Sequence, residues 1–284
     1  MAAVPAGLST VVPNGIVWGD DLQKLFAYAN AHNFALPAVN VTSTCTINAA
    51  LEAAVAMKAP IIIQLSNGGA AFFAGKGVSN EGQKAAILGA VAAAKYVHAV
   101  AEAYPVPIIL HTDHCAKKLI PWLEGMVEYG EKFFAENGRP LFSSHMLDLS
   151  AEPMEYNMEM SKKFLARLDA MKMTLEIELG ITGGEEDGVD NTSADNSSLY
   201  SQPEEICLAY EQLMTVSPRF TIAAAFGNVH GVYKPGNVTL RPEILGAAQT
   251  YIKEKLSLED PLPVDFVFHG GSGSDAADIK TAIT

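Results

Sequence analysis

The stretch Val106-Pro-Ile-Ile-Leu-His-Thr-Asp-His-Cys115 begins with five apolar residues and then breaks into two histidines and an acid. An unbroken apolar run of this kind is typical of a β-strand that is buried on both faces of a parallel sheet. The polar cluster therefore stands at the carboxyl end of a strand, where His111 and Asp113 share one face and His114 points to the other. Such a cluster indicates a metal or acid–base site, or polar residues that bond to neighbouring loops.

The composition is that of a protein with a large packed core. Of 284 residues, 49% are hydrophobic and 18% are charged, and this length is usual for a single α/β barrel. No apolar run approaches the roughly 20 residues of a membrane helix, and the N-terminus lacks the features of a secretory signal. A formal net charge of −13 argues against nucleic acid or an anionic membrane as a partner, because either needs a basic face.

Three cysteines, Cys45, Cys115 and Cys207, are scattered along the chain. This pattern fits reduced thiols and does not fit a cysteine-based zinc framework. We therefore expect a cytoplasmic protein whose metal ligands, if it binds a metal, are histidine and carboxylate groups.

Short apolar runs alternate with longer helical patterns along the chain, which is the pattern of βα units around a parallel sheet. Seven strands are predicted, over residues 35–41, 60–65, 106–110, 141–146, 173–179, 220–226 and 264–268. Helices are predicted over residues 20–31, 43–55, 84–103, 119–133 and 155–170. Between them, residues 66–77 are predicted to form a glycine-rich loop, and residues 180–202 either a mobile active-site loop or a solvated acidic loop. One domain is expected over residues 1–284.

The predicted strand Met173-Thr-Leu-Glu-Ile-Glu-Leu179 alternates polar and apolar residues. Alternation places Thr174, Glu176 and Glu178 on one face. Carboxylates that point into the core of a barrel are rarely found without a cation or a hydrogen-bond partner.

A histidine closely follows three of the predicted strands, at His114, His230 and His269. One histidine at a strand end is most often an ordinary structural residue, but three in the same position are harder to attribute to chance. In a parallel barrel these strand ends meet at the catalytic face. Three histidine ligands with an open position describe a catalytic zinc site.

The run Gly270-Gly-Ser-Gly-Ser274 precedes a predicted helix. Its unobstructed backbone N–H groups at a helix N-terminus are one way for an acidic protein to hold phosphate. A glycine-rich loop alone is a weak signal, but this one adjoins a candidate metal ligand. The combination suggests a phosphorylated carbonyl substrate.

Several motifs together resemble the class II fructose-bisphosphate aldolase family, from about Gly15 onward. They are His-Thr-Asp-His-Cys-Ala-Lys-Lys (111–118), Ile-Glu-Leu-Gly-Ile-Thr-Gly-Gly-Glu-Glu-Asp-Gly (177–188), Phe-Gly-Asn-Val-His-Gly-Val-Tyr-Lys (226–234) and Phe-His-Gly-Gly-Ser-Gly-Ser (268–274). Ser-Asn-Gly-Gly-Ala (66–70) and Leu-Phe-Ser-Ser-His-Met-Leu-Asp (141–148) match as well. The resemblance implies a zinc-dependent TIM (β/α)8 barrel, usually homodimeric. Its members interconvert fructose 1,6-bisphosphate with dihydroxyacetone phosphate and glyceraldehyde 3-phosphate in glycolysis and gluconeogenesis.

The resemblance also assigns roles to residues. It implies zinc ligands at His114, His230 and His269, and a second or displaced metal ion at Asp148 and Glu178. It implies that Asp113 is the catalytic proton donor and that Glu186 moves the C3 proton of the substrate. Substrate and phosphate contacts are implied at Asn40, Ser66, Gly231, Lys234, Gly270, Gly271 and Ser272, with a monovalent cation near the phosphate.

Members of the family continue beyond the position of Thr284 with an eighth strand that carries Asn-x-Asp-Thr and with C-terminal helices. The resemblance therefore implies that these elements are missing from residues 1–284. Two hypotheses follow, an active aldolase and a non-catalytic fragment that binds metal without turnover. Tagatose-bisphosphate aldolase is the alternative enzyme, but the acidic loop and the Cys-Ala-Lys-Lys-Leu segment favour the fructose enzyme.

Overall fold

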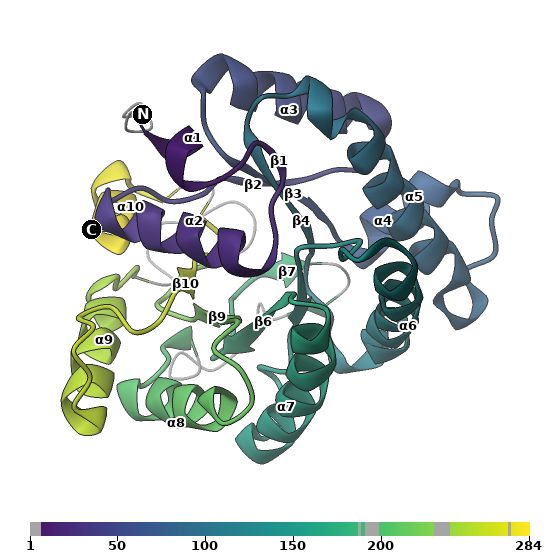
Figure 1. Cartoon of the computed structure of the whole chain (residues 1–284). Coiled ribbons are helices and arrows are strands. Elements are labelled where there is room, and N and C mark those ends of the chain that lie inside the picture. The colour runs from purple at the N-terminus through teal and green to yellow at the C-terminus, as the bar shows by residue number, and fades with distance from the viewer. Residues whose placement is uncertain (1–6, 187–188, 191–198, 230–238, 272–273) are drawn as a thin grey trace. The chain divides into compact units, whose positions relative to one another are not determined.

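The computed structural model describes residues 7–186, 189–190, 199–229, 239–271 and 274–284. Helices alternate with strands along the chain, as the βα pattern predicts (Figure 1). The chain forms two compact units. Unit 1 comprises Met1–Leu147 and Arg167–Leu175, and unit 2 comprises Asp148–Ala166 and Glu176–Thr284. The single domain expected over residues 1–284 stays a prediction.

Five strands of unit 1 form a parallel sheet. They are β1 (Gly15–Ile16), β2 (Ala38–Asn40), β3 (Ile61–Leu65), β4 (Pro107–Thr112) and β5 (Ser144–Leu147). Their order is β2-β3-β4-β5, and β1 pairs with β4 off this path. Every residue of β4 is buried, as the apolar run predicts. The register places Gln64 opposite His111, and His111 opposite Ser144, so polar side chains gather where the strands end.

The helices of unit 1 confirm most of the predictions from periodicity. They are α1 (Leu8–Val11), α2 (Gly19–Ala31), α3 (Thr44–Met57), α4 (Asn67–Ala74), α5 (Lys84–Val100) and α6 (Ile120–Asn137), with 3₁₀ turns η1 (Glu81–Gln83), η2 (Ala101–Ala103) and η3 (Lys117–Leu119). Helix α3 begins as predicted, because the Ser43 side chain accepts a hydrogen bond from the Thr46 backbone N–H and Thr46 returns one to the Ser43 backbone.

The prediction of a glycine-rich loop at residues 66–77 is wrong, since most of this segment is helix α4. Ser66 starts the helix by accepting a hydrogen bond from the Gly69 N–H at 3.2 Å. Helix α4 then lies directly against α5, where a Cβ atom added to Gly89 would fall 1.8 Å from the Ala70 carbonyl oxygen. Close packing between small residues outweighs the low helix propensity of glycine.

The segment Glu81–Ala103 corrects a second expectation. By length and composition alone this 23-residue stretch could cross a membrane, although no such apolar run was expected. Half of its most apolar part is buried inside the protein, with Ala86, Ala90 and Ala94 fully inaccessible. A core helix passes the same test, so the segment is weak evidence for a membrane span.

Unit 2 continues from β6 (Thr174–Leu179), whose last four residues belong to it. Strands β6, β9 (Phe220–Ala224) and β10 (Phe266–Val267) are neighbours in that order, and β10 pairs with β9 in parallel. The remaining helices are α7 (Met154–Ala170), α8 (Pro203–Met214), α9 (Glu243–Leu256) and α10 (Ala276–Ile283). All six residues of β6 are buried, including its two glutamates.

The segment predicted as one loop over residues 180–202 contains regular structure that the sequence analysis missed. Strands β7 (Glu185–Glu186) and β8 (Val189–Asp190) form an antiparallel pair. Residues 187–188 and 191–198 lie outside the described residues. The predicted mobility of this loop stays a prediction.

Candidate active site

Asp113 lies just beyond the end of β4 and is 2% exposed. Its Oδ2 atom accepts hydrogen bonds from Asn40 Nδ2 at 2.8 Å and from Gln64 Nε2 at 3.0 Å. Gln64 also donates to Asn40 Oδ1, so the two amides and the acid form one network. The other oxygen, Oδ1, is buried and has no hydrogen-bond partner among the described residues. Two amides therefore hold one oxygen of this acid and leave the second available for chemistry.

His114 follows directly and has an unusual backbone conformation, with φ of 26°. Five other non-glycine residues described here have a positive φ, but each lies within two residues of an α-helix end: Asn33, Lys58, Gln83, Lys172 and Ser257. His114 lies instead just after a strand end. Its backbone N–H donates a hydrogen bond to the sulfur of Met146 at 3.2 Å. Backbone strain of this kind clusters at functional sites.

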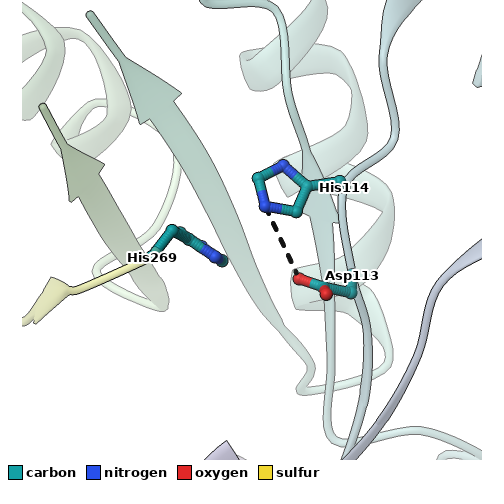
Figure 2. Close-up of side chains that lie close together, drawn as sticks. All are labelled: Asp113, His114 and His269. Atoms are coloured by element: carbon teal, nitrogen blue, oxygen red, sulfur yellow. Dashed lines mark ion pairs between the residues drawn. The ribbon is translucent and has the colours of Figure 1, made fainter. Parts of the chain in front are cut away.

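Figure 2 shows the side chains of Asp113 and His114, with a dashed line for their ion pair. Asp113 Oδ1 and His114 Nε2 are 4.0 Å apart, which is too long for a hydrogen bond. Both side chains are at least nine-tenths buried. A carboxylate and an imidazole held at this distance can share a cation or exchange a proton through a third group.

Two further pairs of polar side chains join β4 to β5. His111 Nδ1 lies 2.8 Å from Ser144 Oγ, and Thr112 Oγ1 lies 2.7 Å from His145 Nδ1. Burial, and to a smaller extent the nearby His111, together lower the pKa of His145 to about 3. His145 is therefore neutral at physiological pH, and this ladder ties the two strands together.

Two carboxylates lie close together in unit 2. One oxygen of Asp148 and one oxygen of Glu178 are within 4.8 Å of each other. Asp148 Oδ1 accepts from the Ser150 backbone N–H at 3.2 Å and from its hydroxyl at 2.7 Å. Glu178 is 2% exposed, and its Oε1 accepts from the Thr182 hydroxyl at 2.7 Å. Paired carboxylates of this kind favour a cation, because two like charges this close repel each other and Glu178 is buried.

His269 follows β10, and its side chain is also drawn in Figure 2. Its Nε2 atom is 2.7 Å from Glu176 Oε1, while its backbone carbonyl accepts from Asn228 Nδ2 at 2.9 Å. Asn228 also donates to Thr182 Oγ1 at 3.2 Å and accepts from the Phe226 N–H at 2.9 Å. This one buried amide therefore connects the histidine segment to the segment that holds Glu178.

Other residues singled out from the sequence are placed in part. Ser66 caps α4, Gly270 has φ of 68°, and Glu186 lies on β7 opposite Val189. Gly271 follows Gly270 and ends the described stretch 239–271. The remaining candidates, His230, Gly231, Lys234 and Ser272, lie outside the described residues.

The sequence analysis missed three side chains that hold these groups in place: Gln64, Thr182 and Asn228. Gln64 carried a usable signal, because it is the one polar residue in the apolar strand β3. A lone amide inside a buried strand needs a partner. Thr182 and Asn228 carried no such signal, because they lie in polar, glycine-rich segments.

Comparisons with known proteins place most of the chain in one family. Residues 20–284 match the family model described as "Fructose-bisphosphate aldolase class-II". The chain is 59% identical to a fructose-bisphosphate aldolase of Haemophilus influenzae over 279 residues, which is 98% of this chain and 77% of that protein. It is 58% identical to the class 2 enzyme of Escherichia coli K12 over 274 residues, covering 96% of this chain and 76% of the relative.

A crystal structure of fructose-bisphosphate aldolase from Campylobacter jejuni is similar in fold as well as in sequence. It superposes with a TM-score of 0.87 at 52% identity, over 98% of this chain and 77% of that chain. The predicted α/β fold of the TIM-barrel class, with parallel strands, is confirmed. On the family model and on these relatives, the chain belongs to the class II fructose-bisphosphate aldolase family.

Proposed function

We propose that this protein is a lyase that reversibly cleaves fructose 1,6-bisphosphate into dihydroxyacetone phosphate and glyceraldehyde 3-phosphate, in glycolysis and gluconeogenesis. The observation that carries the proposal is the arrangement after β4. There the buried Asp113 has one oxygen held by two amides and the other oxygen facing the strained His114. Metal-assisted cleavage of a carbon–carbon bond requires an acid that transfers a proton and a ligand that holds the metal ion. The Asp113 carboxyl group and the His114 imidazole are groups of these two kinds.

The donors in the described residues fit a divalent cation. His114 is buried in a strained backbone conformation, Asp113 Oδ1 is buried without a hydrogen bond among the described residues, and Asp148 lies close to Glu178. Imidazole nitrogens with carboxylate oxygens suit a borderline ion such as zinc.

The proposed catalytic ligands are His114, His230 and His269, and Asp148 and Glu178 are the proposed ligands of a second or displaced ion. A bound zinc ion supplies Lewis-acid polarisation of the substrate carbonyl. A monovalent cation near the phosphate is part of the proposal.

Two acids are proposed to move protons. Asp113 donates a proton to the C4 oxygen during condensation, and Oδ1 is the atom for this step because the amides of Asn40 and Gln64 occupy Oδ2. Glu186, on β7, is proposed to move the C3 proton of the substrate. No lysine nucleophile takes part, and Lys117 and Lys118 lie at the start of a 3₁₀ turn before α6.

The substrate is a small phosphorylated sugar that meets backbone and amide donors. The proposed contacts are Asn40, Ser66, Gly231, Lys234, Gly270, Gly271 and Ser272. The positive φ of Gly270 supports its part, because glycine adopts this conformation without strain and presents backbone N–H groups. A homodimer in the cytosol is proposed, without nucleic acid or membrane partners. The cytosolic location is supported by Cys45, Cys115 and Cys207, which form no disulfide among the described residues.

The test is a coupled aldol-cleavage assay with fructose 1,6-bisphosphate and tagatose 1,6-bisphosphate as alternative substrates. We expect cleavage of the fructose ester, complete loss of rate with a chelator, and recovery with zinc or cobalt. Borohydride added with substrate should trap no covalent adduct. Preference for the tagatose ester would change the substrate assignment, and an adduct on lysine would overturn the metal mechanism.

A further inference from the structure

The His269 side chain lies within hydrogen-bond distance of the Glu176 carboxylate, and both residues belong to unit 2. Nε2 of the imidazole lies 2.7 Å from Oε1 of the carboxylate. By contrast, His114 Nε2 is 4.0 Å from Asp113 Oδ1, beyond hydrogen-bond distance. The two histidines therefore meet their neighbouring acids differently, and the His269 ring has a carboxylate within hydrogen-bond distance.

Both partners of this link are shielded from water. The side chain of His269 is 10% exposed and that of Glu176 is 9% exposed. A carboxylate at this depth is costly unless a donor faces it, and a charge-assisted hydrogen bond to a ring N–H supplies one. Glu176 also lies within β6, where the strand backbone limits how far the carboxylate can move.

The backbone of His269 is restrained at the same time. Asn228 Nδ2 donates to the His269 carbonyl at 2.9 Å, and Asn228 is itself 1% exposed. The preceding residue, Phe268, packs its ring against Phe226 with centroids 4.7 Å apart. These contacts restrain the backbone of His269. The hydrogen bond to the Glu176 carboxylate then sets the orientation of the imidazole ring.

The two ring nitrogens then have different tasks. A carboxylate has only acceptor oxygens, so the nitrogen that faces it carries the hydrogen. The hydrogen on Nε2 leaves the lone pair on Nδ1, and a metal ion binds a histidine through the nitrogen with the lone pair.

We propose that Glu176 is a positioning residue that keeps His269 in the tautomer with Nε2–H, so that Nδ1 is the atom presented to the metal ion. The proposal rests on the proposed function, because it takes His269 as a metal ligand. Glu176 itself is not a ligand in this proposal. Its carboxylate acts on the metal only through the orientation and basicity of the ring.

The experiment compares Glu176→Gln with Glu176→Ala in the full 284-residue chain. The Gln side chain keeps an acceptor oxygen for Nε2–H, whereas Ala removes it. Thr174→Val is the matched control, because Thr174 is buried on the same face of β6 and its described hydrogen bond is to Gln23. Circular dichroism and thermal unfolding show that each variant is folded.

The first readout is the zinc dissociation constant, measured by competition with a chromogenic chelator. Glu176→Ala should bind zinc about 10–100-fold more weakly with the same stoichiometry at saturation. Glu176→Gln should lose less than tenfold, and Thr174→Val should match the unchanged protein. Zinc affinity unchanged in Glu176→Ala would overturn the proposal, and so would loss of stoichiometry, because that would make Glu176 a ligand.

The second readout is the tautomer itself, from long-range ¹H–¹⁵N spectra of protein labelled with ¹⁵N-histidine, with His269→Gln to assign the signal. The unchanged protein and Glu176→Gln should show Nε2–H at His269, and Glu176→Ala should show a mixture. A Gln variant that behaves like Ala would overturn the tautomer mechanism. Unchanged protein that neither binds zinc nor cleaves substrate would instead overturn the proposed function.

Discussion

Strands β4 and β6 are each six residues long and buried throughout, yet they carry charge in different ways. β4 is apolar until its last two residues, and its acid, Asp113, lies just beyond the strand. β6 carries Glu176 and Glu178 inside the strand itself. Asp113 is held on one oxygen by two amides, whereas each glutamate has a short bond to one partner, His269 or Thr182.

The difference separates two uses of a buried carboxylate. An acid beyond a strand end can keep one oxygen available for proton transfer, because the strand does not depend on it. Each buried carboxylate within a strand needs a hydrogen-bond donor to offset its loss of hydration. Removal of that donor therefore lowers the stability of the fold. Changes at Asp113 should therefore act on turnover, and changes at Glu176 and Glu178 should act on stability and metal binding.

The largest expected effect is that of Asp113→Ala. We expect kcat to fall by roughly 10²–10⁴-fold, as on removal of a general acid, while bound zinc is retained. Steady-state cleavage kinetics together with metal analysis of the purified variant test this. Loss of zinc along with activity would make Asp113 a metal ligand and would remove the contrast with β6.

The second prediction concerns pH and the two polar pairs that join β4 to β5. Burial holds the pKa of His145 at about 3 in the folded protein, against 6.5 when exposed. The folded-state pKa is depressed, so the stability from neutral His145 is fully present above pH 6.5 and is lost as the pH falls towards 3. The loss amounts to about 1.4 kcal/mol per pH unit within that window.

Urea unfolding of chelator-treated protein at pH 6.5 and 5 measures this loss without competition at the metal ligands. His145→Gln should flatten the dependence, because glutamine has no proton to take up on unfolding. Equal slopes for the two proteins would assign the acid sensitivity to other groups.

The third prediction tests compensation within β6. Thr182→Val removes the hydroxyl that donates to Glu178 and accepts from Asn228, and should lower the free energy of unfolding by about 1–3 kcal/mol. The matched change Thr174→Val should cost less than about 1 kcal/mol, because its described hydrogen bond from Gln23 is long, at 3.3 Å. Denaturant unfolding of both variants decides the point. Equal losses in the free energy of unfolding would show that the hydrogen bond to Glu178 adds nothing to the contribution of Thr182.

The smallest expected effect is that of Gln64→Leu. Asn40 still donates to Asp113 Oδ2 in this variant, so we expect kcat to fall by only about tenfold, or about 1.4 kcal/mol. Zinc affinity should stay the same. A loss as large as that of Asp113→Ala would mean that the amide network, rather than the acid alone, is needed for turnover.

The elements predicted well are those whose signal is local. The apolar run of β4 and the Ser43 cap of α3 depend on neighbouring residues and were confirmed. Helix α4 was mistaken for a loop because its glycines disfavour a helix locally, whereas its close packing against α5, where Gly89 meets the Ala70 carbonyl, is not visible in the local sequence. Strand β1 was missed because two residues form a strand only through pairing, here Gly15 with Pro107 and Ile16 with Ile108.

The sequence by itself determined the family, the α/β class of fold and the candidates Asp113, His114 and His269, because motifs and strand ends are local patterns. Only the tertiary structure decided which side chains hold them. Gln64 meets Asp113 across 49 residues of sequence, and Glu176 meets His269 across 93. A hydrogen bond depends on distance and direction in space, and folding alone brings such groups together.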